Sequence, residues 1–448
     1  MPKTTRRIFL AIYTIFFVLF ASFLLLNSFG YRINPSKRAI EYSATISIKT
    51  APIDARVSVD NTNHNARTPS DLTINEAGSI GLTITKDNYL PEKIAINYKG
   101  GENTSIFMDR MYLLPTRPST TFPITGTIVA FVNQTTLLVS QNSVLSLQTV
   151  TAAGPVTSIP VVSTLTMPNT RLNFEAVGES AYYDNSAKLV LFNRDGKWRL
   201  INVTALLPLT KSVVATSSEL ILLDTNNQIW SWDYRVLQPS FVDNDVQGID
   251  FLESPRTIWI WKNNWIQRLE INAPLAGQIQ PKNALITNNL LLSERNESFK
   301  IRAVYQGYIF QLGQKLFYRP DYELAQFIPL ATNARLSAVA NDSIYWVNSN
   351  NELIFTNLRN LLRRSIATNL SNAVTSLTYD EYWNRIMLYS DMTVSSIWHD
   401  NDRDNQAINT YPFNNWLSLP CFPNSEQGSQ ICINSNSVEL YTNRNFIL

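Results

Sequence analysis

Three aspartates near the C-terminus have a spacing that suits a metal ion. Asp400, Asp402 and Asp404 alternate along "HDNDRDNQ", and alternating oxygen ligands suit Ca²⁺, which takes about six to eight of them. Two positions depart from a calcium-binding loop. Asn405 stands where a glycine makes the sharp turn, and Tyr411 stands where a glutamate gives two oxygens. The spacing leaves open a Ca²⁺ site or a solvated acidic loop, and the sequence indicates no other cofactor.

Side chains for catalysis are otherwise scarce. The chain holds two histidines, His64 in "NTNHNA" and His399 in "WHDNDRDNQ", and the sequence identifies no partners for a Ser-His-Asp triad or a zinc site. The motifs G-x-S-x-G, H-E-x-x-H and C-x-x-C do not occur. Carboxylates from distant strands can still assemble a glycosidase. We therefore favour a protein that is not an enzyme and keep a hydrolase as an alternative.

The chain has two cysteines, and both flank one turn. Cys421 and Cys432 lie in "LPCFPNSEQGSQICIN", where Pro423 and Gly428 favour a tight return. An oxidising compartment would join them, and a disulfide closing so short a loop stabilises by about 3 kcal/mol in the chain-entropy model. The alternative is a pair of small buried thiols. We favour the disulfide because both cysteines belong to one hairpin.

Three tryptophans fall within "TIWIWKNNWIQRLEI", residues 257–271. In a strand, Trp259 and Trp261 face one side and the intervening isoleucines face the other. A strand apolar on both sides is typical of a sheet packed between two neighbours, and the alternative is a carbohydrate-binding platform. We interpret Trp259 and Trp261 as core. Trp265, which follows the Asn-Asn turn, is the tryptophan expected at the surface and the candidate ligand platform.

The N-terminal segment predicts a membrane anchor. Ile8 to Leu26 is a run of 19 residues without charge, proline or glycine, and a helix of that length rises about 28 Å, which matches the hydrocarbon core of a bilayer. Lys3, Arg6 and Arg7 precede it and favour a cytoplasmic N-terminus, with the rest of the chain outside. A cleaved signal peptide is the alternative, although the run is longer than usual for one.

A small β-domain is predicted from residue 44 to 114. Alternating apolar residues mark four strands, with the core positions Ile46, Ile48, Val57, Val59, Ile80, Leu82, Ile84, Ile94 and Ile96. The stretches "TAPIDARVSVDN", "RTPSDL" and "EAGSIGLTITKDNYLP" resemble the PEGA domain, an extracytoplasmic β-module of bacterial and archaeal surface proteins. Asn61 and Asn88 stand where that family usually has glycine. Roughly seventy residues with four or more strands predict a small sandwich-like module, and the resemblance implies a role in display or protein interaction at the envelope.

Beyond Thr125 a hairpin pattern recurs about every 42 residues between Leu137 and Ile431. Hairpins at this spacing are typical of β-propeller blades with four strands each. Eight copies indicate eight blades, or seven if the first copy closes the ring on the last. Asn-rich turns such as "DTNNQ" supply positive-φ positions in place of glycine. "TNLRNLLRRSI" is expected to form one or two helical turns. The repeat resembles WD-repeat-like propellers in blade length and in "IWSWDY".

These predictions give a mainly β chain with an N-terminal helix. The predicted parts are 1–30 as cytoplasmic tip and transmembrane anchor, 31–43 as linker, 44–114 as PEGA-like domain, 115–125 as Pro-rich linker and 126–448 as propeller. The net charge of +2 gives no field that would recruit nucleic acid. We expect a single-pass protein of the cell membrane whose extracytoplasmic propeller binds a protein or glycan partner at the cell surface. A structural subunit of an envelope assembly is the alternative.

Overall fold

The computed structural model places most of the chain, which divides into two compact units with a first boundary between Arg117 and Pro118. The described residues are 3–28, 31–34, 39–42, 44–60, 62–74, 78–98, 105–133, 135–151, 154–163, 165, 172–216, 218–236, 238–252, 256–262, 265–270, 279, 285–286, 298–304, 306–322, 326–340, 342–367, 370, 374–380, 384–390, 393–399, 409–412, 421–424, 429–434 and 437–442.

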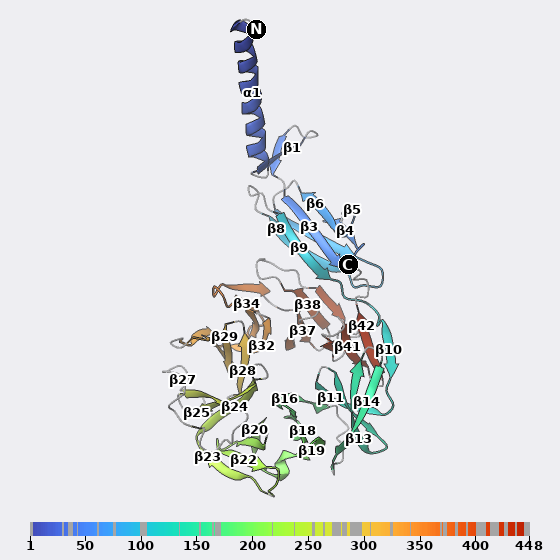
Figure 1. Cartoon of the computed structure of the whole chain (residues 1–448), viewed down its shortest axis with the longest axis vertical. Coiled ribbons are helices and arrows are strands. Elements are labelled where there is room, and N and C mark those ends of the chain that lie inside the picture. Colours follow the sequence, from blue (N-terminus) through green and yellow to red (C-terminus); the bar gives the residue numbers. More distant parts are fainter. Residues whose placement is uncertain are drawn as a thin grey trace. The chain divides into compact units, whose positions relative to one another are not determined.

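The first unit begins with helix α1 (Lys3–Ser28) (Figure 1). Within it, Phe9–Leu26 is long and apolar enough to cross a membrane, and no part of this stretch is buried against protein. The Thr14 hydroxyl donates a hydrogen bond to the Leu10 carbonyl at 2.9 Å, which satisfies a polar group inside the helix. A helix that is apolar on every side needs apolar surroundings. A helix that spans the membrane and a signal anchor would each have such apolar surroundings.

A two-stranded hairpin and a small domain follow the helix. The hairpin joins β1 (Tyr31–Asn34) to β2 (Ala39–Tyr42), inside the segment predicted as a linker. One sheet of the domain has the order β6-β3-β9, from Ser70–Ile74, Ala44–Ala51 and Ser105–Tyr112. The other has the order β5-β4-β7-β8, from Thr62–Arg67, Arg56–Val59, Gly78–Thr85 and Glu92–Tyr98. This confirms the sandwich-like prediction.

The core of the small domain matches the alternating pattern of the sequence. Its buried members include the predicted positions Ile46, Ile48, Val57, Ile80, Leu82, Ile84, Ile94 and Ile96, with Val59 packed at the margin. Asn88 has a φ of 66°, as expected of a residue at a glycine position, and Asp60 has a φ of 44°. Asn61 lies outside the described residues. The two sheets therefore share one apolar interior built from alternate strand positions.

The described residues between 120 and 442 form eight blades, and each blade has four antiparallel strands. Blades 1 to 4 comprise β11 (Thr127–Asn133), β12 (Thr136–Gln141), β13 (Val144–Thr151), β14 (Gly154–Val162); β16 (Glu175–Gly178), β17 (Ala181–Asp184), β18 (Leu189–Arg194), β19 (Lys197–Asn202); β20 (Thr210–Ala215), β21 (Glu219–Asp224), β22 (Ile229–Asp233), β23 (Ser240–Asp243); and β24 (Val246–Leu252), β25 (Thr257–Lys262), β26 (Trp265–Glu270), β27 (Leu285–Ile286). A short strand, β15 (Leu172–Asn173), pairs with β11, and the turn η1 (Val203–Ala205) follows β19.

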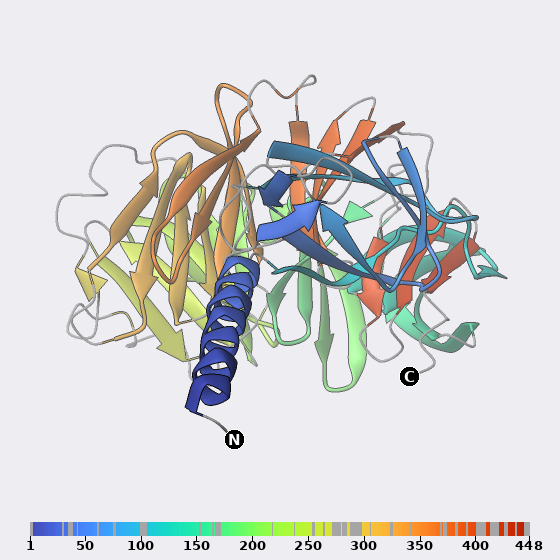
Figure 2. The ribbon, with the colours of Figure 1, turned by 90° about the horizontal axis from the view of Figure 1, so that it is seen from above.

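Blades 5 to 8 repeat the same order. They comprise β28 (Phe299–Val304), β29 (Gly307–Leu312), β30 (Lys315–Pro320), β31 (Ile328–Ala331); β32 (Ala334–Ala340), β33 (Ser343–Asn348), β34 (Leu353–Asn357), β35 (Arg363–Ala367); β36 (Val374–Asp380), β37 (Arg385–Ser390), β38 (Thr393–Trp398), β39 (Asn409–Pro412); and β40 (Cys421–Asn424), β41 (Ser429–Asn434), β42 (Ser437–Thr442), β10 (Thr120–Pro123). The strands of each blade run side by side (Figure 2). This confirms the propeller prediction.

The ring closes through the last blade. β10 pairs with β42, so that Thr120 lies opposite Leu440 and Pro123 lies opposite Ser437. The outer strand of blade 8 thus comes from the start of the propeller, and the propeller begins before residue 126. The count of eight follows because the first hairpin forms a blade of its own while β10 completes the last one. This pairing ties the last blade to the start of the propeller.

Apolar side chains fill the spaces between blades, and Trp259 and Trp261 are among them. Ile258 and Ile260 pack against blade 3, whereas Trp259 and Trp261 pack against blade 5. The Trp259 ring centroid lies 5.1 Å from that of Tyr308. Both tryptophans are buried. The interpretation of these two residues as core is confirmed, and each face of strand β25 is covered by a neighbouring blade.

Asparagines occupy positive-φ positions in the hairpin turns, as expected, but one segment predicted to be helical is a turn. Asn227 and Asn351 have φ values of 62° and 57° in their hairpin turns. The segment "TNLRNLLRRSI" was predicted to be helical, and this prediction is wrong. It contains the end of β34, a turn and β35. The side chains of Asn357 and Asn360 accept hydrogen bonds from backbone N–H groups within the turn, which closes it without a helix.

Candidate functional site

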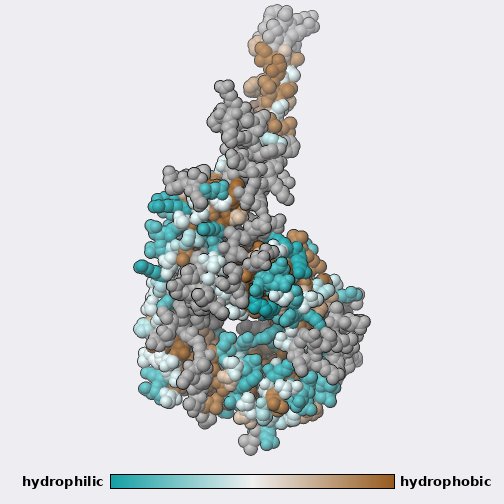
Figure 3. Space-filling model, turned by 180° about the vertical axis from the view of Figure 1, so that it is seen from behind, coloured by the Kyte–Doolittle hydropathy of each residue, from teal (hydrophilic) through white to brown (hydrophobic). Residues whose placement is uncertain are grey.

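The first strand of each blade lies beside the first strand of the next, as seen for β16, β20, β24, β28, β32 and β36 (Figure 1). Seen from behind, the space-filling view is open near the middle of this ring (Figure 3). Charged residues lie on several of these inner strands. We name Glu175, Lys211, Asp250, Lys300 and Arg302 the inner-strand cluster. These residues come from blades 2, 3, 4 and 5.

Asp250 is the carboxylate of the cluster that is most removed from water. Its Oδ2 accepts a hydrogen bond from the backbone N–H of Ile301 at 2.6 Å. Burial raises the pKa of Asp250 to about 6, although the nearby Lys300 charge and this hydrogen bond act in the opposite direction. Because burial disfavours the charged form, Asp250 keeps its proton to a higher pH than an exposed carboxyl group does. A carboxyl group of this kind can exchange a proton near its raised pKa.

The remaining members of the cluster connect blades to one another. Lys300 donates a hydrogen bond to Glu175, which joins blade 5 to blade 2. Arg302 donates to the Ser337 carbonyl of blade 6 at 2.9 Å, and Lys211 donates to the Gln247 carbonyl of blade 4 at 2.9 Å. Burial lowers the pKa of both Lys211 and Arg302. These contacts hold inner strands of different blades in register.

A further ion pair joins blade 2 to blade 4. Arg256 and Glu179 form it, and both residues lie in the turn that follows the first strand of their blade. Glu175, by contrast, opens its strand. The two ion pairs therefore lie at opposite ends of strand β16. The arrangement provides polar ties across the ring, and it also brings the Glu175 charge close enough to raise the pKa of Asp250 further.

Sequence reasoning missed the inner-strand cluster, although a signal was present. Asp250 interrupts the apolar strand "VQGIDFL", and Lys300 and Arg302 alternate with apolar residues in "FKIRAV". A charge inside a strand that packs on both faces is costly unless it finds a partner. Such positions therefore mark polar contacts between blades. Their partners come from other blades and cannot be read from spacing.

The predicted metal residues Asp400, Asp402 and Asp404 lie outside the described residues. Within the residues that are described, no group of three or more His, Cys, Asp or Glu side chains could hold a metal ion. His399, just before the triplet, is buried, and His64 lies in β5. The Ca²⁺ site therefore stays a prediction.

The other predicted residues lie at two hairpins. Trp265 opens β26 opposite Lys262 and is half-buried, so its role as a ligand platform stays a prediction. Cys421 lies opposite Cys432 on the paired strands β40 and β41. Cys432 is buried and disulfide-bonded in the structure.

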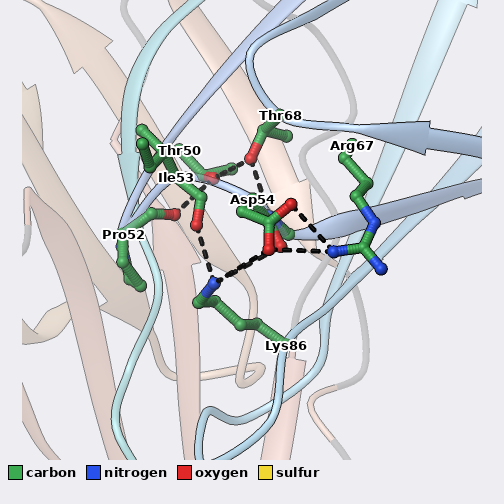
Figure 4. Close-up of polar contacts among 8 residues, drawn as sticks. Thr50, Pro52, Ile53, Asp54, Arg67, Thr68 and Lys86 are labelled. Atoms are coloured by element: carbon green, nitrogen blue, oxygen red, sulfur yellow. Dashed lines mark hydrogen bonds and ion pairs between the residues drawn. The ribbon is translucent and has the colours of Figure 1, made fainter. Parts of the chain in front are cut away.

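A second polar site lies in the small domain, around the turn between β3 and β4 (Figure 4). Asp54 has a φ of 66°, and Arg67 Nη1 donates to both of its carboxylate oxygens at 2.9 Å. This contact holds the pKa of Asp54 below its usual value. Lys86 Nζ donates to the Ile53 carbonyl at 2.7 Å. The two cations fix a turn that displays Ile53, which is exposed.

The chain shows distant likenesses to several solved structures. The chain is similar to BamB from Moraxella catarrhalis, with 10% identity, a TM-score of 0.43 and coverage of 74% of this chain and 98% of that one. It is similar to Sqt1 from Saccharomyces cerevisiae, with 10% identity, a TM-score of 0.44 and coverage of 73% and 99%. It is also similar to apo AztD from Citrobacter koseri, with 11% identity, a TM-score of 0.39 and coverage of 80% of this chain and 98% of that one. The strand pairings, and not these likenesses, establish the propeller architecture.

The small domain gives a clearer comparison. No curated protein matches the chain in sequence. The family model described as "PEGA domain" matches residues 43–110, a range that holds the Asp54 turn and both sheets of the sandwich except for the last two residues of β9. The match confirms the resemblance read from "TAPIDARVSVDN" and the two stretches that follow it. The chain therefore carries a PEGA domain, followed by an eight-bladed β-propeller.

Proposed function

We propose that the protein is a membrane-anchored extracytoplasmic interaction protein. In this proposal α1 holds the chain in the cell membrane, and the PEGA domain and the propeller lie outside. The propeller then presents its surface to a partner at the cell envelope. A PEGA domain beside a β-propeller supports a protein-interaction role in general terms.

The observation that carries the proposal is the exposure of α1. Phe9–Leu26 contributes no side chain to the interior of the protein, so folding of the described domains does not explain its apolar character. Leaving such a helix in water exposes apolar surface at about 25 cal/mol for each Å². A bilayer removes that cost. Lys3, Arg6 and Arg7 before the span support a cytoplasmic N-terminus.

Protease treatment of intact cells tests the topology. A peptide tag after Leu448 is followed on blots before and after addition of external protease. We expect the tagged propeller to be lost from intact cells, and a cytoplasmic marker protein to be untouched. In cells with a permeable outer layer, the anchor fragment should stay with the membrane. Full protection of the tag in cells where another surface protein is digested would overturn the proposal.

A further inference from the structure

The turn between β34 and β35 contains a residue with an unusual backbone conformation. We name residues 358–362 the blade-6 turn. Leu361 there has a φ of 58°. Among the thirteen described non-glycine residues with positive φ, Leu361 is the one with an apolar side chain, while the others are Asp, Asn, Ser, Lys or Gln. The left-handed conformation is unfavourable for a bulky residue.

Hydrogen bonds on several sides hold the strained turn in place. The backbone N–H of Leu358 donates to the Asp342 carbonyl at 2.8 Å, and that of Asn357 donates to the Leu362 carbonyl at 3.0 Å. The N–H groups of Arg359 and Leu362 donate to the side chains of Asn357 at 2.9 Å and Asn360 at 3.0 Å. The surrounding contacts therefore impose the conformation of Leu361. Strain imposed in this way is typical of functional positions.

The turn exposes two leucines side by side. Leu361 is 42% exposed and Leu362 is 54% exposed, whereas Leu358, at the start of the turn, is 4% exposed and packs between blades 5 and 6. The buried leucine anchors the turn, and the two exposed ones contribute little to the core. Because hydrogen bonds hold the backbone of this turn, the pair loses little backbone freedom when a partner covers it. The pair therefore has the properties of a docking element.

Arginines surround the two leucines. Arg359 and Arg363 are exposed on either side of them, and Arg359 forms an ion pair with Asp342. The Arg363 guanidinium lies 5.1 Å from the Trp346 ring centroid, and that of Arg364 lies 4.5 Å from the Phe355 ring centroid. These ring contacts fix where the two guanidinium groups lie. Positive charge around an apolar pair is complementary to a negatively charged, partly apolar partner.

The same end of a neighbouring blade also exposes an apolar side chain. Strands in a blade are antiparallel, so the turns after its first and third strands lie at the same end. In blade 5 the turn after the third strand, β30, carries Tyr322, which is 62% exposed. Blades 5 and 6 share one apolar cluster that includes Leu358 and Tyr318. Tyr322 is thus an exposed side chain with an apolar ring at the corresponding end of blade 5.

We infer that the blade-6 turn is a docking site for an acidic segment of a protein partner, with Leu361 and Leu362 covered by its apolar side chains and Arg363 facing its carboxylates. This inference rests on the proposed function, since it names the surface that the interaction protein uses. Two leucines with flanking arginines also suit an anionic membrane. The protein partner is favoured because hydrogen bonds hold the turn rigid, and a membrane needs no fixed geometry.

Peptide binding to the purified full chain in detergent tests the inference. The probes are fluorescent peptides of one length that carry the same two leucines and a phenylalanine, with glutamate, glutamine or lysine elsewhere. We expect binding of the glutamate peptide at least about tenfold tighter than that of the glutamine peptide, because charge complementarity adds to the apolar contact. Added salt should weaken it. Equal binding of the three peptides, or no binding of the glutamate peptide, would refute the inference.

Three variants locate the binding. The double variant L361S/L362S should weaken the glutamate peptide by at least about tenfold, and R363Q should weaken it less and reduce its salt dependence. The matched control is Val144→Ser, since Val144 is 61% exposed and opens β13, directly after the turn between the second and third strands of blade 1. The control should bind as the parent does. Loss of binding in the control, or no loss in L361S/L362S, contradicts the inference.

A photo-crosslinking amino acid at position 361 identifies the partner class in intact cells. We expect adducts whose joined peptides are acidic, and no such adducts from the same group at position 144. Adducts to lipid, to neutral or basic segments, or no adduct at all would overturn the inference. The peptide assay does not depend on membrane orientation, whereas the protease assay depends on nothing else. The inference and the proposed topology can therefore fail independently.

Discussion

Replacing Asp250 with asparagine should stabilise the propeller at neutral pH. Asparagine keeps an oxygen that can accept the hydrogen bond from the Ile301 N–H, and it removes the charge that burial disfavours. The pKa of Asp250 is raised from 3.8 to about 6. At about 1.4 kcal/mol for each pKa unit, full ionisation costs the folded state about 3 kcal/mol at pH 7. A weaker hydrogen bond to a neutral acceptor offsets about 1 kcal/mol of that gain.

The sign of the pH dependence follows from the direction of the pKa shift. Because the folded-state pKa lies above the unfolded one, the folded state binds the extra proton, and its stabilising effect is fully present below pH 3.8 and lost as pH rises through about 6. The parent protein should therefore lose stability over this range relative to Asp250→Asn. The two proteins should differ least near pH 4 and most above pH 7.

Urea unfolding followed by tryptophan fluorescence measures this difference. Trp259 and Trp261 pack between blades 4 and 5, next to the strands that hold Asp250 and Ile301, so they report on the affected region. Midpoints are compared for the full chain in detergent from pH 4 to pH 8. A difference that does not change with pH would refute the reasoning about ionisation. A variant less stable than the parent at pH 7 would show that the Asp250 charge is well paired.

The remaining predictions concern ring closure, the cysteines and the Asp54 turn. Deleting residues 430–448 removes β42 and leaves β10 without its partner, so this form should aggregate during purification, whereas a soluble, cooperatively unfolding product would count against closure. Intact mass after thiol blocking should show no alkylation of Cys421 or Cys432 until a reductant is added, and two alkylated cysteines in the unreduced protein would exclude the disulfide. Asp54→Ala should lower the melting temperature of the PEGA domain more than Asp54→Gly, because both lose the Arg67 contact but glycine accepts the positive φ. The reverse order would show that backbone strain is unimportant there.

The blades could be predicted from sequence because their pattern is local. Alternation in "TIWIWK" places Trp259 and Trp261 on one side and isoleucines on the other, and any ring of blades covers both sides. The core of the PEGA domain could be predicted for the same reason. The exposure of Trp265 was harder to predict, because the next strand of a blade can cover a residue at the edge of a turn. In this blade the next strand is β27, which pairs with β26 at Trp265.

Features that join distant residues could not be predicted in this way. β10 contains a proline and looks like a connector, and only its pairing with β42 makes it a blade strand. Asp250 and Lys300 acquire their roles from strands of other blades. The prediction of a helix at the blade-6 turn was wrong for a different reason. Its leucines and arginines favour a helix by propensity, but Asn357 and Asn360 bind the backbone locally and the flanking strands are already paired.

The pairing of Thr120 with Leu440 also bears on how the protein is made. Synthesis proceeds from the N-terminus, so α1 and β10 emerge long before β42, which is about 320 residues further along. Local hairpins can form as they appear, but the ring stays open until the final strands arrive. During this interval the first and last blades each present an uncovered side. If the propeller lies outside the membrane, this unfinished ring must be kept from aggregating on the far side, after the ribosome has released the chain.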